Sequence, residues 1–419
     1  SQFLHVLVDE YQDTNKAQYE LTQLLGKPQN NVYVVGDFSQ SIYAWRGADY
    51  RNLNYLENDF DGISKYKLEQ NYRSTQTMLD AATQVISNNT GHPVLKLWTE
   101  HESQDLITVL ETKDNEDEAR TVIDEILTSL RDYKHQDIAI LYRVNAQSRA
   151  FEEAFMRRGI AYQIVGGFKF YERKEVKDAL SYLRLILNPE DEVSKNRALK
   201  LGKRRYIKFS TWRDKQLQLN PLEALEGSLK ASDYLGKYNK EDPQDLARIE
   251  NIQELLNVAA KFQDLATFLE NIALVQDKYL ADISDQNQQS SITLMSFHAA
   301  KGLEFPVVFM VGMEEGLLPH SRSLYDTKQL EEERRLCYVG ITRAKNKLYL
   351  SYAKRRWQYG QSSPALKSRF LNEINSKLMI KKGEPIDSHQ TPKRRLIIED
   401  DVLDSVLSGD IDLDAFLKS

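Results

Sequence analysis

The stretch ITLMSFHAAKGLEFPVVFMVGMEEGLLPH, residues 292–320, contains two short apolar runs separated by a polar turn. The runs Ile292–Met295 and Val307–Val311 are continuous rather than alternating, and both contain β-branched residues. This pattern is typical of strands that are buried on both faces, as in a parallel sheet. The stretch therefore predicts two neighbouring units of a layered α/β fold.

Similar runs occur elsewhere in the chain, at Phe3–Val8, Val32–Val35, Ile138–Leu141 and Leu348–Leu350. Helical patterns lie between them. From Ala119 to Leu130 the apolar residues recur at i, i+3, i+4, i+7, i+8 and i+11, which places them on one face of a helix. Alternating strands and helices predict α/β layers around parallel sheets.

Two regions depart from this alternation. Between Asn188 and Gln289 there is no convincing strand, and Leu246–Phe262 and Leu265–Val275 have helical periodicity. We interpret this region as a helical domain inserted into the second α/β domain. After Pro385 the sequence becomes rich in Asp and Glu, which indicates an acidic tail that could dock a protein partner. The front edge of the helical region is basic, with Lys200, Lys203, Arg204, Arg205, Lys208, Arg213 and Lys215.

Composition excludes several classes of protein. The chain has 419 residues, with 56 Lys and Arg against 62 Asp and Glu, so its net charge is −6. This balance excludes a globally basic nucleic-acid coat protein but allows a local basic groove. The single cysteine, Cys337, allows neither an intrachain disulfide nor a cysteine-based zinc site. No apolar run approaches the ~20 residues that span a bilayer, and the N-terminus lacks signal-peptide features. We therefore expect a cytoplasmic protein with no membrane contact.

Carboxylates follow the first two predicted strands. Asp9 and Glu10 end one strand, and Gly36-Asp37 end the next, followed by Gln40. Ligands of open parallel sheets bind beyond the carboxyl ends of the strands. A carboxylate pair there can hold Mg²⁺ and orient a water molecule. A lone Asp-Glu is more often a solvated strand end, but two such ends in one sheet favour a site.

Other candidate residues are weak evidence when taken singly. Aromatic residues and a cation at Tyr43, Trp45 and Arg46 are typical of single-strand nucleic-acid contacts, although an isolated Trp is more often in the core. In Gln70–Ser74 an arginine could reach a phosphate. His298 could be an acid, a base or a metal ligand, but a lone His is more often structural. The charge pattern of Glu331–Arg335 alone indicates a salt-bridged surface helix.

In order along the chain, these segments resemble the UvrD/PcrA/Rep-type superfamily 1 DNA helicases. The matching words are LVDEYQDTN, VVGDFSQSIYAWRGAD, LEQNYRS, IVGGFKFYERKEVKD, the stretch 292–320 quoted above, and EEERRLCYVGITRAKNKLYL. The match covers nearly the whole chain apart from the tail. It implies RecA-like parallel-sheet motor lobes, the first incomplete, with a helical domain inserted in the second. The predicted segments are 1–66 for the first lobe, 67–188 and 289–385 for the second lobe, 189–288 for the insertion and 386–419 for the acidic tail.

The resemblance implies an ATP-dependent 3′→5′ DNA helicase that couples ATP hydrolysis to translocation on single-stranded DNA and to duplex unwinding. In the first lobe, Asp9 is expected to bind Mg²⁺ and Glu10 to activate the hydrolytic water. Gln40 is expected to sense the γ-phosphate. These roles fit phosphoryl transfer, which needs positioning and charge neutralisation more than covalent chemistry.

The second lobe is expected to supply the remaining nucleotide contacts. The resemblance places Tyr72 on the adenine and Arg73 on the γ-phosphate. It places Glu304, beside Gly302, at the ribose or phosphate region, and makes Arg343 an arginine finger. An arginine from the second lobe makes domain closure and hydrolysis interdependent.

The resemblance also implies a path for single-stranded DNA, and duplex DNA as a further partner. The residues expected to line the path are Tyr43, Trp45, Arg46 and His298. Each closure of the lobes can then move the strand past the aromatic side chains.

Two features depart from the family pattern. The sequence contains no G-x-x-x-x-G-K-[ST] phosphate loop, which in the family precedes the Asp-Glu strand. We therefore expect the C-terminal portion of a helicase, with little ATPase activity on its own. Where the family has a Gly-rich turn in the helical insertion, this chain reads Gly202-Lys203-Arg204-Arg205-Tyr206-Ile207. That difference leaves the duplex contact of the insertion open.

Two other functions remain open at this point. The chain could be a DNA-binding or partner-binding module that has lost its motor. It could also be a two-metal nuclease built on Asp9, Glu10, Asp13 and Asp37. The order of the motifs already accounts for these carboxylates, so the nuclease is the weaker hypothesis.

Overall fold

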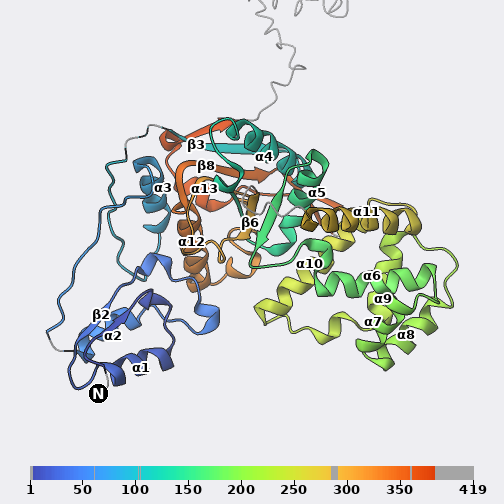
Figure 1. Ribbon diagram of the computed structural model, residues 1–419, viewed down its shortest axis with the longest axis horizontal. Helices are drawn as coiled ribbons and strands as arrows, with labels where there is room; N and C mark the ends of the chain where they lie inside the picture. The colour runs from blue at the N-terminus through green and yellow to red at the C-terminus, as the bar shows by residue number, and fades with distance from the viewer. Residues whose placement is uncertain are drawn as a thin grey trace, which may run out of the picture. The chain divides into compact units, whose positions relative to one another are not determined.

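The computed structural model describes residues 3–60, 62–101, 103, 105–284, 291–358 and 361–382. The N-terminal segment contains two parallel strands, β1 (Val6–Val8) and β2 (Val32–Val34), with helices α1 (Lys16–Gly26) and α2 (Asn52–Asp59) (Figure 1). Its small core is formed by Tyr11, Tyr19, Leu56 and Phe60. Because β1 and β2 are parallel, their carboxyl ends lie at the same edge of this small sheet.

A seven-stranded parallel sheet forms the centre of the described chain. Its strand order is β11-β3-β8-β7-β4-β6-β5, and every neighbouring pair is parallel. The strands are β3 (Ile107–Thr112), β4 (Ile138–Tyr142), β5 (Tyr162–Val165), β6 (Ile292–Ser296), β7 (Phe305–Met310), β8 (Ala344–Ala353) and β11 (Met379–Lys382). The sheet therefore joins segments from before and after the helical insertion, as the α/β prediction requires.

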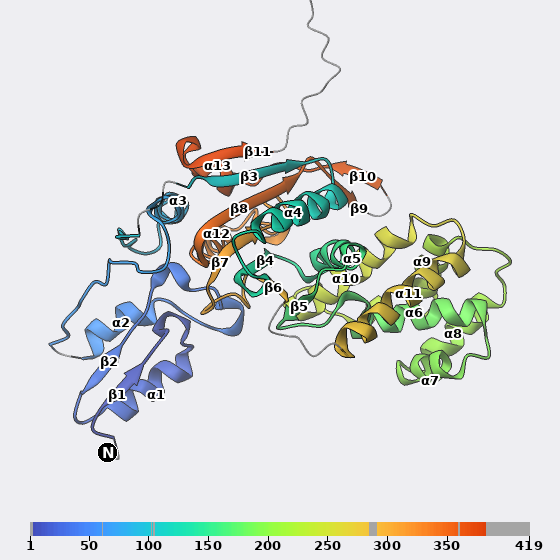
Figure 2. The same ribbon diagram turned by 45° about the horizontal axis from the view of Figure 1, so that its top comes forward.

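Helices cover both faces of this sheet (Figure 2). Ile138 and Ile140 of β4 belong to a core that includes α4 (Asn115–Ser129) and α5 (Ser148–Arg158). Ala139 and Leu141 belong to the opposite core. That core includes α3 (Gln76–Ile86), α12 (Thr327–Ile341) and α13 (Arg369–Glu373). Because alternate side chains enter different cores, the strand is apolar throughout. The predicted α/β class is confirmed.

The helical region is built from α6 (Lys174–Leu187), α7 (Glu192–Lys200), α8 (Lys203–Arg213), α9 (Pro221–Ala231), α10 (Pro243–Ala259) and α11 (Leu265–Ser284). Helix α6 precedes the predicted boundary at residue 188, yet it packs against α7, α9, α10 and α11. The domain boundaries stay predictions. The acidic tail lies outside the described residues.

A hairpin of β9 (Arg355–Gln358) and β10 (Gln361–Pro364) follows β8. None of the helices in the described part of the chain is both long and apolar enough to cross a membrane.

Candidate functional site

The carboxyl ends of β1 and β2 are joined by a buried glutamine. The Gln12 side chain donates to Glu10 Oε2 at 2.5 Å and accepts from the backbone N–H of Asp37 at 3.0 Å. Glu10 has a left-handed backbone (φ 50°), which costs a non-glycine residue about 1–2 kcal/mol. Asp9 is exposed and accepts from the Glu10 N–H at 2.8 Å. The strand ends thus hold the predicted carboxylates together, with local strain of the kind found at functional sites.

Lys301 lies in the turn between β6 and β7 of the seven-stranded sheet, and its side chain enters this acidic cluster. Its ammonium lies 3.1 Å from Glu10 Oε2, donates to Gln40 O at 2.8 Å and also pairs with Asp13. The Lys301 side chain is only 7% exposed. Burial raises the pKa of Asp13, and Lys301 opposes that rise. Lys301 is thus a cation at the acidic end of β1 that the sequence prediction did not assign.

The carboxylates near β1 are chemically suited to Mg²⁺, which usually binds through one or two carboxylates, water and substrate phosphates. Asp9 provides such an exposed carboxylate. In the described part of the chain, no three His, Cys, Asp or Glu side chains form a group that could hold a metal ion by themselves. A metal held jointly by Asp9 and a phosphate is the arrangement that fits.

Two arginines of the second lobe lie close to each other. Arg73 pairs with Glu304 at 2.6 Å and donates to Thr342 O at 3.3 Å. Lys345 lies on the other oxygen of Glu304 at 2.5 Å, and hydrogen bonds from Lys345 and Arg73 lower the pKa of that carboxyl. Glu304 therefore orients Arg73. Two residues before Glu304, Gly302 has φ 83°, a backbone conformation that favours glycine.

Arg343 is 2% exposed and donates to Val339 O, Leu303 O and Thr342 Oγ1 at 2.9, 3.2 and 3.0 Å. Within the described residues it forms no ion pair. Burial and, to a smaller extent, the charge of Arg73 lower the pKa of Arg343 to about 10, although Glu10 opposes this shift. Arg343 still carries its charge at neutral pH. A buried cation without a carboxylate partner provides a place for an anion.

Gln40 and Tyr72 complete the predicted nucleotide residues. Gln40 donates to Asp37 Oδ2 at 2.9 Å. Burial and the charge of Asp37 raise the pKa of Tyr338, so this phenol stays neutral beside the end of β2. Tyr72 is 84% exposed and donates to Gln70 at 2.8 Å. The structure therefore places Gln40 beside the acidic cluster and leaves the Tyr72 ring open to solvent.

The four predicted DNA-path residues meet in one cluster. The rings of Tyr43, Trp45 and His298 lie 6.2–6.5 Å apart, and the Arg46 guanidinium lies 4.5 Å from the Trp45 ring. The Tyr43 hydroxyl donates to His298 O at 3.1 Å. Burial and the nearby charge of Arg143 lower the pKa of His298 to about 3. His298 is thus a neutral ring at physiological pH, and Trp45 is exposed rather than in the core.

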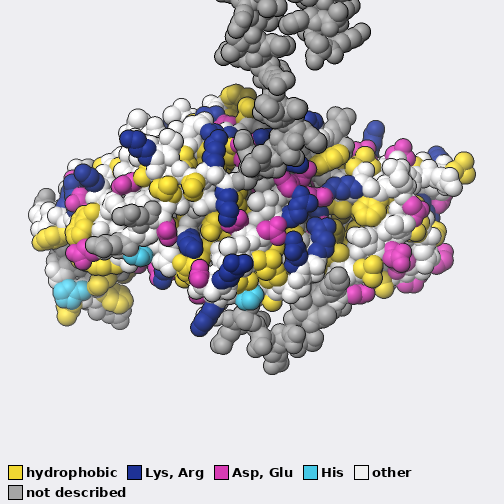
Figure 3. Space-filling model, turned by 90° about the horizontal axis from the view of Figure 1, so that it is seen from above, with side chains coloured by type: hydrophobic (Ala, Val, Ile, Leu, Met, Phe, Trp, Pro, Cys, Tyr) yellow, Lys and Arg dark blue, Asp and Glu magenta, His cyan; other side chains and the backbone are white. Residues whose placement is uncertain are grey.

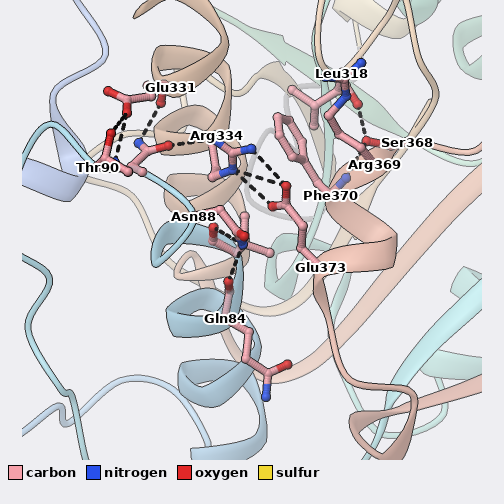
Figure 4. A network of polar contacts seen from close by, with 12 residues as sticks. Gln84, Asn88, Thr90, Leu318, Glu331, Arg334, Ser368, Arg369, Phe370 and Glu373 are labelled. Carbon is pink, nitrogen blue, oxygen red and sulfur yellow. Dashed lines mark hydrogen bonds and ion pairs between the residues drawn. The ribbon is translucent and has the colours of Figure 1, made fainter. Parts of the chain in front are cut away.

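Helix α12 corrects one expectation from the sequence. Its charged run Glu331–Arg335 is not a surface feature: Glu331, Glu333, Arg334 and Arg335 are all less than 9% exposed. Arg334 donates to both oxygens of Glu373, as Figure 4 shows. It also donates to Asn89 Oδ1 at 2.7 Å. Charge pattern alone misplaced this helix because the partners of Arg334 come from the segment after α3 and from α13, which are separated from it in sequence.

The same helix contacts the loop that follows β2. Glu332 accepts from the Ala44 N–H at 3.1 Å, next to the aromatic cluster. Arg335 donates to Ser41 O at 2.7 Å. Sequence reasoning missed these contacts, since nothing in the local pattern indicates that α12 reaches the first lobe.

Comparison with known proteins identifies the family. The model of the UvrD-like helicase C-terminal domain matches residues 66–211 and 203–355, and that of the UvrD/REP helicase N-terminal domain matches residues 1–61. The chain is 38% and 39% identical over 452 residues to proteins described as ATP-dependent DNA helicase PcrA from Staphylococcus aureus strain Mu50 and Staphylococcus epidermidis strain RP62A. These matches cover 95% of this chain and 60% of each relative.

The described parallel sheet is consistent with the RecA-like lobes of helicases. The chain belongs to the UvrD-like helicase family. It spans 60% of the length of the relatives named above.

Proposed function

We propose that this chain is part of an ATP-dependent DNA helicase that moves 3′→5′ on single-stranded DNA. The observation that supports the proposal is the electrostatic environment of Arg343. Arg343 is buried, forms no ion pair within the described residues, and interacts electrostatically with Arg73 and with Glu10. An arginine within electrostatic range of a second arginine and of a carboxylate suits the charge pattern of phosphoryl transfer to water.

Each residue has a role in this proposal. Arg73 and Arg343 neutralise phosphate oxygens, and Glu10 accepts a proton from the attacking water. Gln40 orients that water or the terminal phosphate. Asp9 holds Mg²⁺, which neutralises phosphate charge when bound. Gln12 supports Glu10 through its 2.5 Å hydrogen bond.

The remaining residues bind rather than react. Tyr72 stacks on the adenine, and Glu304 with Gly302 supports the phosphate or ribose side by holding Arg73 at 2.6 Å. Tyr43, Trp45, Arg46 and His298 bind the single strand by stacking and charge. Although the chain has a net charge of −6, Lys and Arg side chains gather locally on the face seen in Figure 3, which allows phosphate contacts.

The Lys301 contacts indicate how the two lobes communicate. Lys301 pairs with Glu10 and Asp13, while His298, only a short turn earlier, belongs to the DNA cluster. We propose that a strand bound at His298 shifts this turn and draws Lys301 away from Glu10. Glu10 then becomes a stronger base for water.

The test compares the 419-residue chain with a chimera that adds the N-terminal part of the S. aureus relative. We expect the chain alone to hydrolyse ATP poorly, because it has no phosphate-loop motif. The chimera should show Mg²⁺-dependent ATPase activity stimulated by oligo-dT. It should also unwind duplexes with 3′ tails and not those with 5′ tails. An inactive chimera that is folded and binds DNA would contradict the motor proposal.

The second candidate is a binding module without a motor. It predicts DNA binding by the chain with no gain of ATPase activity in the chimera. The nuclease alternative fits less well, because Lys301 pairs with two of its four carboxylates. Cleavage of DNA by the chain with Mg²⁺ and no nucleotide would revive it.

We also propose a cytoplasmic location and a protein partner for residues 386–419. Fluorescence microscopy of a tagged form tests the location. Deleting the tail should leave the DNA-stimulated ATPase activity of the chimera unchanged. Duplex binding by the basic edge of the helical region is a further expectation, tested by comparing single-stranded and duplex oligonucleotides.

A further inference from the structure

Phe168 is a large aromatic side chain that the sheet presents to solvent. It follows β5 in the loop Gly166-Gly167-Phe168 and is 70% exposed. Gly166 has φ 76°, a conformation that glycine adopts without strain. The nucleotide-binding and DNA-binding roles proposed for other residues do not involve the Phe168 ring.

The loop lies beside the turn that carries His298. Strand β5 pairs with β6 in parallel, with Val165 opposite Met295 (Figure 2). A Cβ atom added to Gly166 would lie 3.4 Å from Ala299 Cβ, the residue after His298. Because β5 and β6 are parallel, their carboxyl ends lie at the same edge of the sheet. The loop that carries Phe168 after β5 therefore lies next to the turn that carries His298 after β6.

The backbone of Phe168 is fixed although its ring is exposed. Arg173, which is 5% exposed, donates to Phe168 O at 3.2 Å. The same guanidinium donates to Asn145 O, Asn251 Oδ1 and Ser148 Oγ at 2.9, 2.7 and 2.7 Å. A ring held by an anchored loop loses little conformational entropy on binding, which is the condition for a preorganised contact.

We propose that Phe168 is a base-stacking platform for single-stranded DNA on the second lobe, next to the cluster of Tyr43, Trp45 and His298. This inference rests on the DNA-binding function proposed above and adds a contact site on the lobe that carries β5. Every base offers a π-face to an exposed ring, so the contact needs no sequence preference.

The surroundings of Phe168 favour a nucleic acid over a protein partner. Its neighbours in the loop are two exposed glycines and Lys169, which do not supply the apolar area found in the core of a protein–protein interface. Arg46 is exposed in the adjoining cluster, where its guanidinium lies 4.5 Å from the Trp45 ring. A cation among open rings suits a chain of bases and phosphates.

The experiment measures binding of fluorescein-labelled oligo-dT to the full 419-residue chain at fixed salt. Phe168→Ala should weaken binding about tenfold, because stacking on one base contributes about 1–3 kcal/mol. Phe168→Trp should restore binding, and its added Trp fluorescence should be quenched by the oligonucleotide. The matched control is Ile380→Ala, since Ile380 is 52% exposed on β11 at the opposite edge of the same sheet.

Oligo-dT binding by Trp45→Ala distinguishes a failure of the proposed stacking by Phe168 from a failure of the proposed DNA-binding function. If Trp45→Ala weakens binding but Phe168→Ala does not, the stacking platform is wrong and the DNA-binding function stands. If the unaltered chain binds no oligo-dT, both are wrong. Weaker binding by Phe168→Ala that Phe168→Trp does not rescue, or equal weakening by Ile380→Ala, would also overturn the platform.

Discussion

Helix α12 and the residue just beyond it both carry buried charge, but they use it differently. In the middle of the helix, Arg334 forms a two-pronged ion pair with Glu373, and Glu333 forms one with Arg143. Just beyond the C-terminal end, Arg343 is also buried, but among the described residues it donates to two backbone carbonyls and a hydroxyl and forms no ion pair.

This difference separates a structural role from a ligand-binding role. A buried charge with a fixed counter-ion holds elements together, and removing one partner is strongly destabilising. A buried cation without one keeps its charge available for an incoming anion. Helix α12 therefore combines a fixed middle, held to α3 and α13, with a C-terminal side that is prepared for phosphate.

The largest expected effect is on catalysis by Arg343. In the ATPase-active chimera, Arg343→Met should lower DNA-stimulated kcat by about 10³-fold or more, as expected for an arginine finger. Its free energy of unfolding should fall less than that of Arg334→Met, because hydrogen bonds to Val339, Leu303 and Thr342 are lost but no ion pair is. The measurements are steady-state ATPase assays and urea unfolding. Unchanged kcat with a loss of stability as large as that of Arg334→Met would make Arg343 a structural residue and remove the contrast with Arg334.

The second effect is on stability, at the ion pair in the middle of α12. Arg334→Met should lower the free energy of unfolding by about 3–5 kcal/mol, because it leaves Glu373 without its buried partner. Urea unfolding of the 419-residue chain measures this. The double variant with Glu373→Leu should recover part of the loss. A loss below about 1 kcal/mol would show that this pair does not fix the helix.

The sequence predicted the central strands of the fold because these strands are apolar on both faces. It missed β3, β5 and β11. In β3, half-buried Glu111 interrupts the apolar run and pairs with Lys354. Strands β5 and β11 are short and lie at the two edges of the sheet, where exposed positions such as Ile380 are tolerated. Within the seven-stranded sheet, continuous apolar patterning therefore identified only central strands.

The candidate site was predicted in parts. The carboxylates after β1 and the arginines at positions 73 and 343 stand in recognisable words of the sequence, and Arg343 interacts electrostatically with Arg73 and Glu10. Their partners were not predictable in the same way. Lys301 lies 288 residues from Asp13, and no local pattern indicates that contact. Long-range pairing decides which charges are satisfied, and it follows from the tertiary fold.

A third, smaller effect tests Lys301, a buried cation that does have carboxylate partners. Burial already raises the pKa of Asp13, and Lys301 opposes the rise. Lys301→Met should therefore raise that pKa further and cost about 1–3 kcal/mol near pH 7. A carboxyl with a raised pKa in the folded state binds protons more tightly there than when unfolded. Stability of the variant should therefore recover as pH falls from about 7 to about 5.

The control for this pH dependence is the double variant Lys301→Met with Asp13→Asn. It has no titrating group at position 13 and should lose the recovery. Urea midpoints at both pH values measure the effect. Equal pH dependence in the single and double variants would show that Asp13 is not the group responsible.

The smallest effect is expected where an ion pair is exposed. Lys16 and Glu20 of α1 lie 3.8 Å apart, with side chains that are 90% and 58% exposed. Water and salt screen such a pair, so Lys16→Met should change the free energy of unfolding by about 0.5 kcal/mol or less. The same chemical change, lysine or arginine to methionine, is thereby made at an exposed pair, at the buried pair of Arg334 and at the unpaired Arg343. If the Lys16 variant lost as much stability as the Arg334 variant, burial would not be what distinguishes the charges of α12 from those at the surface.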